Sequence, residues 1–227
     1  MTRKKAAPAP SSPERILDAA ERLFAISGYD GVSLRQIARE AAVEVALSNY
    51  HFGPKADLFL AVVQRRADEL NEARMTLFAA LPDPPTLEGL IDAFARPFME
   101  KSLRGGPGWK SYAQLVAHLA NSQRWTRVVM ATQFDPVAKT FIAGMRRALP
   151  QTDVRDLYWG FHFMLGAMTM TFAETGRIDG LSGGRCKSSA LDTIYARMIP
   201  FLAAGFRQLA APDPKARRRR APRRKTT

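Results

Sequence analysis

Apolar residues recur at spacings of three and four along almost the whole chain of 227 residues. Runs of β-branched residues with period-two alternation are missing. Spacings of three and four place apolar side chains on one face of a helix, whereas strict alternation is typical of half-buried strands. The pattern therefore predicts an all-α fold of about nine helices, with three short helices first and longer ones behind.

Residues that start and stop helices divide this pattern into segments. Ser12 and Pro13 suit the N-cap and first residue of the first helix, and Gly28 suits its end. Ser33 and Gln36 have the spacing of a capping box, which marks the start of a second helix. The sequence thus predicts a short loop between Gly28 and Ser33.

Glycine and proline also divide the later part of the chain. Gly53-Pro54 opens a long helix to about Leu81, and Pro82–Pro85 breaks it. Later helices are expected over about 86–103 (bent by Pro97), 109–122, 124–134, 136–149, 153–175 and 188–211, with glycine-rich loops at 105–108 and 176–184.

Two basic segments flank the helical body. Residues 1–12 carry a net charge of +3, and residues 212–227 carry +7 of the chain's total of +13. Both segments contain proline and few apolar residues, so we expect them to be disordered and attracted to phosphates without regard to sequence. Tails that only improve solubility are the alternative. The predicted domains are an arm (1–12), a head (13–60), a helical domain (61–211) and a tail (212–227).

Several classes of protein are disfavoured. Cys186 is the single cysteine, so no intramolecular disulfide is possible and a cytoplasmic setting is expected. No apolar run reaches about 18 residues, so we expect no membrane span. The three histidines are spread over positions 51, 118 and 162, and no nucleophile elbow or phosphate loop is present. We therefore expect no enzyme activity, no cofactor and no bound metal.

Residues 33–55 predict a helix, a tight turn, a short helix and the start of a third. A short helix held at a fixed angle is suited to enter the major groove of DNA. Ser33 and the first helical amides would then face a phosphate. Asn49 would make a bidentate contact to adenine, and Val45 or Ala46 would touch a thymine methyl group.

Neighbouring side chains complete the predicted DNA contacts. Tyr50 and His51 would hydrogen-bond phosphates, which fixes register without reading sequence. Arg35 and Gln36 would reach a phosphate or a base, and Lys55 would add its charge to the positive end of the next helix.

Structural alternatives stay open for several of these residues. Tyr50 could belong to the core, and Asn49 could only cap a helix or be solvated. His51 and Phe52 could both be packing residues that close the three-helix head, and for Phe52 this is the preferred interpretation.

The motif resembles the TetR family of bacterial transcriptional regulators over about residues 13–63, and its Asn-Tyr-His-Phe-Gly-x-Lys segment is similar to the PsrA type. The residues that carry the resemblance are Ile16–Phe24, Gly28-Tyr29, Ser33–Ala38, Asn49–Phe52, Lys55 and Leu58. The resemblance implies a ligand-responsive repressor that reads a pseudo-palindromic operator in double-stranded DNA. It also implies a homodimer formed through the last two helices in a four-helix bundle.

Three positions depart from the pattern of that family. Ala42 stands where glycine is usual, Glu44 where a small polar cap is usual, and Ser48 where an apolar residue is usual. If Ala42 has a positive φ, alanine costs about 1 kcal/mol more there than glycine. Glu44 suits a helix N-terminus but repels a nearby phosphate.

The predicted head carries no net charge. Seven basic and seven acidic residues lie between Glu14 and Arg66. Non-specific attraction to DNA would then come mainly from the tails, and we expect Arg3, Lys4 and Lys5 to follow the DNA backbone or minor groove.

The larger domain is rich in large apolar residues, which favours a ligand pocket between helices. The predicted pocket residues are Phe94, Phe98, Trp109, Tyr112, Trp125, Phe163 and Met164. A packed core is the alternative, and it is preferred for most of the apolar residues in this domain. The expected effector is uncharged and elongated or aromatic.

The leading hypothesis is a ligand-responsive DNA-binding transcriptional regulator. The alternative is a non-specific architectural nucleic-acid-binding protein that uses its basic tails. Selective operator binding that survives deletion of the tails would favour the regulator.

Overall fold

The computed structural model describes residues 10–211. Most of the predicted basic arm and all of the predicted basic tail lie outside this range. No described helix is both long enough and apolar enough to cross a membrane.

Within the described range the fold is all-α, as predicted. It has eleven α-helices, nine of which have seven or more residues, and one π-helix. The elements are α1 Ser12–Ser27, α2 Leu34–Glu40, α3 Val45–Phe52, α4 Lys55–Ala79, α5 Leu87–Arg104, α6 Pro107–Ala120, α7 Gln123–Trp125, the π-helix η1 Thr126–Phe134, α8 Asp135–Ala148, α9 Val154–Phe172, α10 Arg177–Leu181 and α11 Leu191–Ala210.

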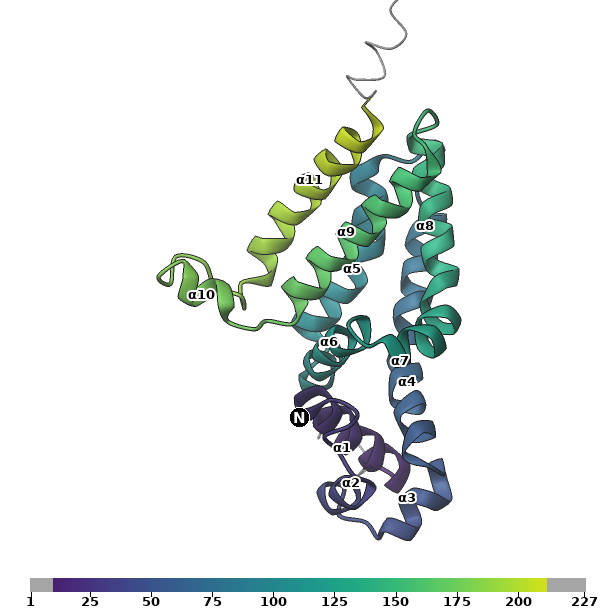
Figure 1. Ribbon diagram of the computed structural model, residues 1–227, viewed down its shortest axis with the longest axis vertical. Helices are drawn as coiled ribbons and strands as arrows, with labels where there is room; N and C mark the ends of the chain where they lie inside the picture. Colours follow the sequence, from purple (N-terminus) through teal and green to yellow (C-terminus); the bar gives the residue numbers. More distant parts are fainter. Residues whose placement is uncertain (1–9, 212–227) are drawn as a thin grey trace, which may run out of the picture.

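The helices form an elongated molecule with a small head and a larger body (Figure 1). Helices α1, α2 and α3 make the head, and α4 runs from the head into the body. Helices α5, α8, α9 and α11 make the far end of the body, while α6 lies between the two parts and packs against α1. The head is thus joined to the body through α4 and also through the α1–α6 contact.

Local hydrogen bonds explain where the first helices begin and end. The backbone N–H of Ser11 donates to the Glu14 carboxylate at 2.7 Å, so Ser11 caps α1 one residue before the predicted cap. The backbone N–H of Gln36 donates to Ser33 Oγ at 3.3 Å, and the N–H of Ser33 donates to Gln36 Oε1 at 2.7 Å. The predicted capping box is therefore confirmed. Gly28 ends α1 with φ 66°, also as predicted.

Two later segments differ from the prediction. The expected helix at 124–134 is a short α7 followed by η1, which continues into α8 without a loop. A π-helix carries more residues per turn than an α-helix, and the apolar spacing does not reveal this change. The expected loop at 176–184 contains the short helix α10. Pro97 lies inside α5, which continues through it to Arg104.

One apolar core extends from the head into the body. Trp125 of α7 contacts both Tyr29 and Phe59, with ring centroids 4.7 Å and 4.5 Å apart. Phe24 in turn packs edge-on against Phe59 at 5.0 Å. Aromatic packing of this kind resists sliding because the rings interlock, so the head is packed firmly against the body at this point.

Candidate DNA-binding surface and ligand cavity

Helix α3 presents the predicted recognition residues to solvent. Ala46, Asn49 and His51 are exposed, and the Tyr50 side chain is 82% exposed. Val45 is half-buried at the start of the helix. Tyr50 is therefore not part of the core, and its ring rests edge-on against His51 at 5.2 Å. The helix thus exposes amide, phenol and imidazole groups, which are side-chain types that contact bases and phosphates in DNA complexes.

The start of α2 belongs to the same helix-turn-helix motif as α3. Ser33, Arg35 and Gln36 are all exposed. The Gln36 amide oxygen accepts from both the N–H and the hydroxyl of Ser33, at 2.7 Å each. Arg35 forms no ion pair among the described residues, and its contact with a phosphate or a base stays a prediction.

Lys55 has protein partners that the sequence did not reveal. Its ammonium donates to the carbonyl oxygens of Tyr29 at 3.0 Å and Val32 at 2.9 Å. The same group lies 4.1 Å from the centre of the Tyr29 ring. Lys55 therefore fastens the turn between α1 and α2 to the start of α4, and its contact with DNA stays a prediction.

The three positions that depart from the family pattern, Ala42, Glu44 and Ser48, have different local environments. Ala42 has φ 52°, so alanine occupies the left-handed conformation that favours glycine. Ser48 is fully buried, and its hydroxyl has no hydrogen-bond partner among the residues that the structure describes. Glu44 is the N-cap of α3 but makes no side-chain capping bond. Phe52 packs against the core, as predicted. The motif thus keeps its geometry despite two locally unfavourable residues.

A buried carboxylate joins the head to α4. The side chain of Glu21 is 1% exposed and accepts from Arg65 Nη2 at 2.5 Å and Arg66 Nε at 3.1 Å. Arg65 also pairs with Asp18 at 2.8 Å. Burial alone would lower the pKa of Arg65, but hydrogen bonds and charges from Glu21 and Asp18 outweigh burial and raise that pKa. The junction is therefore held by a network of ion pairs in which the buried Glu21 carboxylate has two arginine partners.

The first turn of α6 approaches this network closely. A Cβ atom at Gly108 would lie 2.4 Å from Arg66 Nη2 and 2.9 Å from Glu21 Oε1. The guanidinium of Arg66 also lies over the Trp109 ring at 5.0 Å. Helices α1, α4 and α6 therefore meet at one point, where glycine leaves room for the ion pairs.

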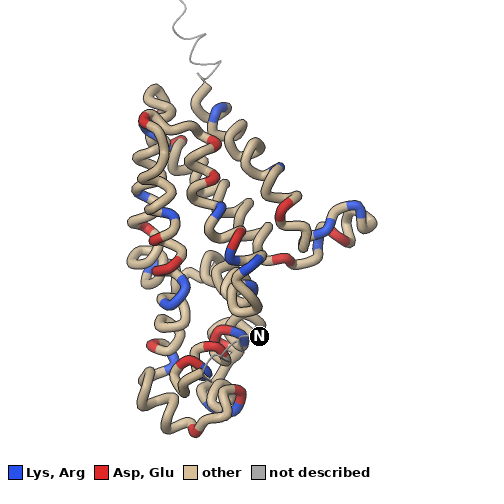
Figure 2. The backbone as a smooth tube through the Cα atoms, turned by 180° about the vertical axis from the view of Figure 1, so that it is seen from behind, with Lys and Arg blue, Asp and Glu red and all other residues tan. Residues whose placement is uncertain are grey.

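Acidic and basic positions are interleaved over the described part of the head (Figure 2). This agrees with the neutral charge of residues 14–66 in the sequence. Attraction of the head to DNA then depends on individual side-chain contacts more than on a long-range positive electrostatic field.

The body contains a cavity of about 1120 Å³. Its walls come from α4, α5, α6, η1, α8 and α9, and from Ala25 and Ile26 at the end of α1. The main apolar wall residues are Leu70, Phe94, Phe98, Met130, Phe134, Phe161, Leu165 and Met168. A space of this size with mainly apolar walls is typical of a small-molecule site.

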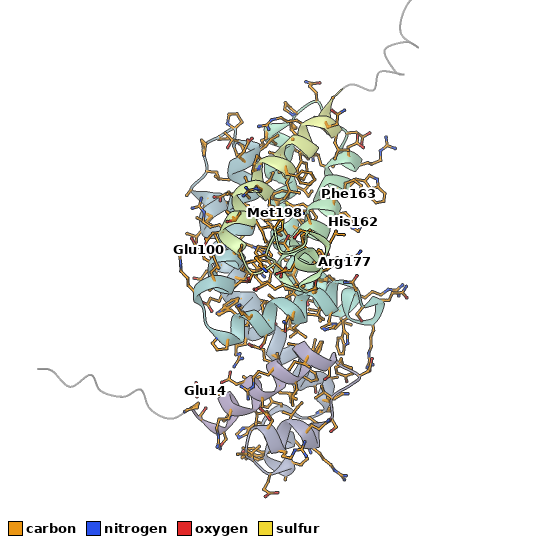
Figure 3. All side chains as sticks on the ribbon, turned by 90° about the vertical axis from the view of Figure 1, so that its left-hand side faces the viewer. Glu14, Glu100, His162, Phe163, Arg177 and Met198 are labelled. Carbon is orange, nitrogen blue, oxygen red and sulfur yellow. The ribbon has the colours of Figure 1, made fainter. Side chains whose placement is uncertain are left out.

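The structure separates the seven predicted pocket residues. Phe94 and Phe98 line the cavity. The other five lie elsewhere: Trp109, Tyr112, Trp125 and Met164 are buried in the packed core, and Phe163 is 58% exposed. Figure 3 labels Phe163 beside His162 on α9. Large apolar residues fill a core and line a cavity equally well, so their type alone could not distinguish the two environments.

Sequence reasoning missed the polar groups of the cavity. Arg74 lines it although the residue is only 4% exposed. Its Nε donates to the carbonyl oxygen of Phe94 at 2.8 Å, and its guanidinium lies 4.1 Å from the centre of the Phe94 ring. Burial lowers the pKa of Arg74 to about 10. One signal was available, because Arg74 follows the buried Leu70 at the i+4 spacing of the inward face.

His118 links the cavity wall to the head. Its Nε2 lies 3.1 Å from the carbonyl oxygen of Ala25 in α1. Both residues line the cavity. The part of the cavity wall on α6 is therefore in direct contact with the last turn of α1.

Matches to known families cover both parts of the chain. Residues 16–62 match the family described as bacterial regulatory proteins, tetR family. Residues 92–205, half of the chain, match the tetracyclin repressor-like C-terminal domain. The two matches, over the head and over the body, define a helix-turn-helix transcriptional regulator. The chain belongs to the TetR family, and it is therefore a DNA-binding regulator and not an enzyme.

Individual relatives match mainly over the head. The chain is 33% identical over 85 residues to the regulator AcrR of Shigella flexneri, which is 37% of this chain and 40% of AcrR. It is 39% identical over 71 residues to SrpR of Pseudomonas putida, which is 31% of this chain and 33% of SrpR. The matches thus span less than half the length of these relatives.

Solved structures match over most of the chain. A TetR-like regulator from Rhodococcus sp. RHA1 aligns with TM-score 0.63 and 18% identity, covering 91% of this chain and all of that one. The regulator FadR of Bacillus subtilis, in complex with stearoyl-CoA, aligns with TM-score 0.55 and 16% identity, covering 84% and 97%. At such low identity these likenesses show the fold alone.

Proposed function

We propose that the protein is a ligand-responsive repressor that binds a pseudo-palindromic operator in double-stranded DNA as a homodimer. The observation that carries the DNA-binding part is the exposed set Asn49, Tyr50 and His51 on α3, held on a well-packed head. The segment Asn49–Lys55 also supports a relationship to the PsrA type. We further propose that it acts in the cytoplasm, where its operator would be accessible.

The dimer would form through α9 and α11. Trp159, Phe163 and Met170 are exposed and share one face of α9, Tyr158 is exposed on its flank, and Phe201 on α11 is 73% exposed. Trp159 and Phe163 stack with centroids 6.1 Å apart. Exposed apolar patches of this kind usually mark interaction sites, and two helices from each subunit would make a four-helix bundle.

The effector would act through the contacts between the cavity and the head. Helix α4 carries Leu70 and Arg74 on the cavity wall and continues into the head. On α1, Ala25 and Ile26 form part of the same wall. A ligand that favours one arrangement of these helices shifts the population of head spacings, and a dimer whose spacing no longer fits two half-sites releases its operator.

Structural neighbours support a small-molecule effector. FadR of Bacillus subtilis is seen with stearoyl-CoA, and a regulator from Saccharomonospora viridis, with TM-score 0.58 and 20% identity over 84% of this chain and 95% of that one, is seen with choline. The two ligands differ in charge and size. Proteins with this fold thus accommodate different chemistries, and the ligand of this chain must be inferred from its own cavity.

DNA recognition is tested by selecting bound duplexes from a random pool and measuring affinity for the selected operator. We expect Asn49→Ala to weaken binding by about 10- to 100-fold, because an adenine loses its bidentate partner. Gln151→Ala, a matched amide truncation at an exposed position remote from the head, should leave affinity unchanged. Equal affinities for wild type and Asn49→Ala would contradict the assigned role.

Dimerisation is tested by light scattering. Wild type should be a dimer at micromolar concentration, and Phe163→Glu should shift it towards monomer because a charge would enter the apolar interface. Leu181→Glu, at a 76% exposed position on α10, is the matched control. A wild-type monomer would rule out the proposed dimer.

Because the head carries no net charge, we propose that the basic tail supplies part of the non-specific attraction to DNA. Deletion of residues 212–227 tests this role. The deletion variant should keep its preference for the selected operator over random DNA, with a smaller salt dependence of binding. An unchanged salt dependence would contradict a role of the tail in DNA binding.

A further inference from the structure

Arg74 is a buried cation with no counter-ion among the described residues. Within residues 10–211, only its Nε has a hydrogen-bond partner, the carbonyl oxygen of Phe94, and no carboxylate lies within 4.0 Å of its guanidinium. The Nη atoms make no hydrogen bond to a described residue, and Arg74 lines the cavity. Glu21, the other charge buried this deeply near the junction, is instead bound by two arginines.

The charge of Arg74 persists in the folded protein. Burial lowers its pKa only to about 10, so the guanidinium stays protonated at neutral pH. A buried charge that lacks partners is strongly unfavourable and is normally paired. The ring of Phe94 at 4.1 Å provides some compensation, but an aromatic face carries no net charge.

The two carboxylates of the cavity wall, Glu174 and Asp135, do not pair with Arg74. Glu174 lies 3.5 Å from Lys110, and Asp135 is exposed at the start of α8. The Tyr112 hydroxyl, which is buried near Arg74, is neutral because burial raises its pKa. Arg74 is therefore a buried positive charge on the cavity wall that has no negatively charged partner among the described residues.

We infer that the cavity binds an organic anion, with an apolar body along the aromatic and aliphatic walls and a carboxylate or phosphate head group on Arg74. This inference rests on the proposed function, because it assigns the chemistry of the effector to the cavity that would regulate DNA binding. It replaces the uncharged ligand expected from the sequence.

The geometry of arginine suits such a head group. A guanidinium has five N–H donors, and the single bond from Nε to Phe94 leaves the donors on the two Nη atoms. Carboxylate and phosphate oxygens accept two such bonds side by side, and these charge-assisted bonds are among the strongest in proteins. Leu70, one turn before Arg74 on α4, begins the apolar wall that would receive the body of the ligand.

The test uses three probes with the same ten-carbon chain: decanoate, decyl phosphate and decanol. Binding to the full-length protein is measured by calorimetry and by the shift of the thermal midpoint. Wild type should bind at least one anion about tenfold or more tightly than decanol, because only an anion satisfies the buried cation. The better of the two anions identifies a carboxylate or a phosphate as the head group.

The variants isolate the contribution of Arg74. Arg74→Met should raise the thermal midpoint without ligand and abolish the preference for anions, because it removes the unpaired charge and keeps an apolar side chain. Arg74→Lys retains the charge without the fork and should bind the anion with intermediate affinity. Arg127→Met, at an exposed position on η1, is the control and should leave the anion preference unchanged.

Three results would overturn the inference: no binding of either anion to wild type, equal binding of decanol, or an anion preference that survives in Arg74→Met. Release of the selected operator is measured in parallel to test the proposed function separately. Release by decanol alone would keep a ligand-responsive regulator and reject the anion. Anion binding through Arg74 without operator release would keep the ligand class and reject the regulation.

Discussion

Glu21 and Arg74 are both almost fully buried charges, but their surroundings are opposite. Glu21, at the junction of head and body, accepts hydrogen bonds from Arg65 and Arg66. Arg74, in the cavity of the body, has one backbone carbonyl and one aromatic ring. The first arrangement fixes helices relative to one another, whereas the second leaves binding capacity unused. The paired charge at the junction thus stabilises the fold, whereas the unpaired charge in the cavity lowers the free energy of unfolding.

The largest expected effect comes from removing the satisfied charge. We expect Glu21→Gln to lower the free energy of unfolding by about 2–3 kcal/mol, because Arg66 loses its acidic partner and Arg65 keeps only Asp18. Urea denaturation measures this change. Asp18→Asn removes a carboxylate that is 47% exposed and should cost less than about 1 kcal/mol. Equal losses in the two variants would show that burial of Glu21 has no special role.

A second change shows that the body is tightly packed away from its cavity. A Cβ atom at Gly160 would lie 2.4 Å from the buried Phe206 ring. Gly160→Ala should therefore lower the free energy of unfolding by about 1–3 kcal/mol, because α9 and α11 must separate. Gly166→Ala, on the same helix, would place its Cβ atom more than 4 Å from other described residues and is the control, to be measured at the same protein concentration. A tolerated Gly160→Ala would indicate loose packing throughout the body.

A third prediction compares a buried, unpaired serine hydroxyl in the head with one in the body. Ser48 in the head and Ser102 in the body are buried, and neither hydroxyl has a hydrogen-bond partner within residues 10–211. Replacing each with alanine should raise the free energy of unfolding by about 1 kcal/mol, because an unsatisfied polar group is removed. Ser33→Ala should instead lower it by about 1 kcal/mol, since it deletes the cap of α2. Destabilisation by Ser48→Ala would reveal an essential role for that hydroxyl.

The smallest effect concerns the turn of the DNA-binding motif. Ala42→Gly should raise the free energy of unfolding by about 0.5–1 kcal/mol, because glycine adopts the observed φ of 52° without strain. Ala46→Gly, inside α3, should lower it by a similar amount because glycine weakens a helix interior. Thermal denaturation of both variants checks the pair. Effects of the same sign would mean that the strain at Ala42 is compensated by other contacts.

The head was predictable because its signals are local. The capping box depends only on Ser33 and Gln36, three positions apart, and the structure confirms it. The bounds of α3 also depend on nearby residues, and the observed helix Val45–Phe52 is close to the predicted short helix. The cavity was less predictable because the same residue types form its wall and the core. A wall residue differs only in having empty space on one side, where a core residue has packed side chains. Trp109 and Tyr112 fill the core, whereas Phe134 and Phe161 line the cavity, although all four are aromatic. The partners of Lys55 and the π-helical turns of η1 depend on tertiary contacts that short-range patterns do not contain.

The last turns of α1 form part of the cavity wall and part of the head at once. Under the proposed regulation, DNA and effector compete for the conformation of this segment without touching each other. The coupling free energy between two such sites is reciprocal, so operator DNA must weaken effector binding by the same factor by which the effector weakens DNA binding. An operator-bound dimer would therefore sense the effector at a higher concentration than the free dimer, and the number of operator copies in a cell would help to set the concentration that triggers release.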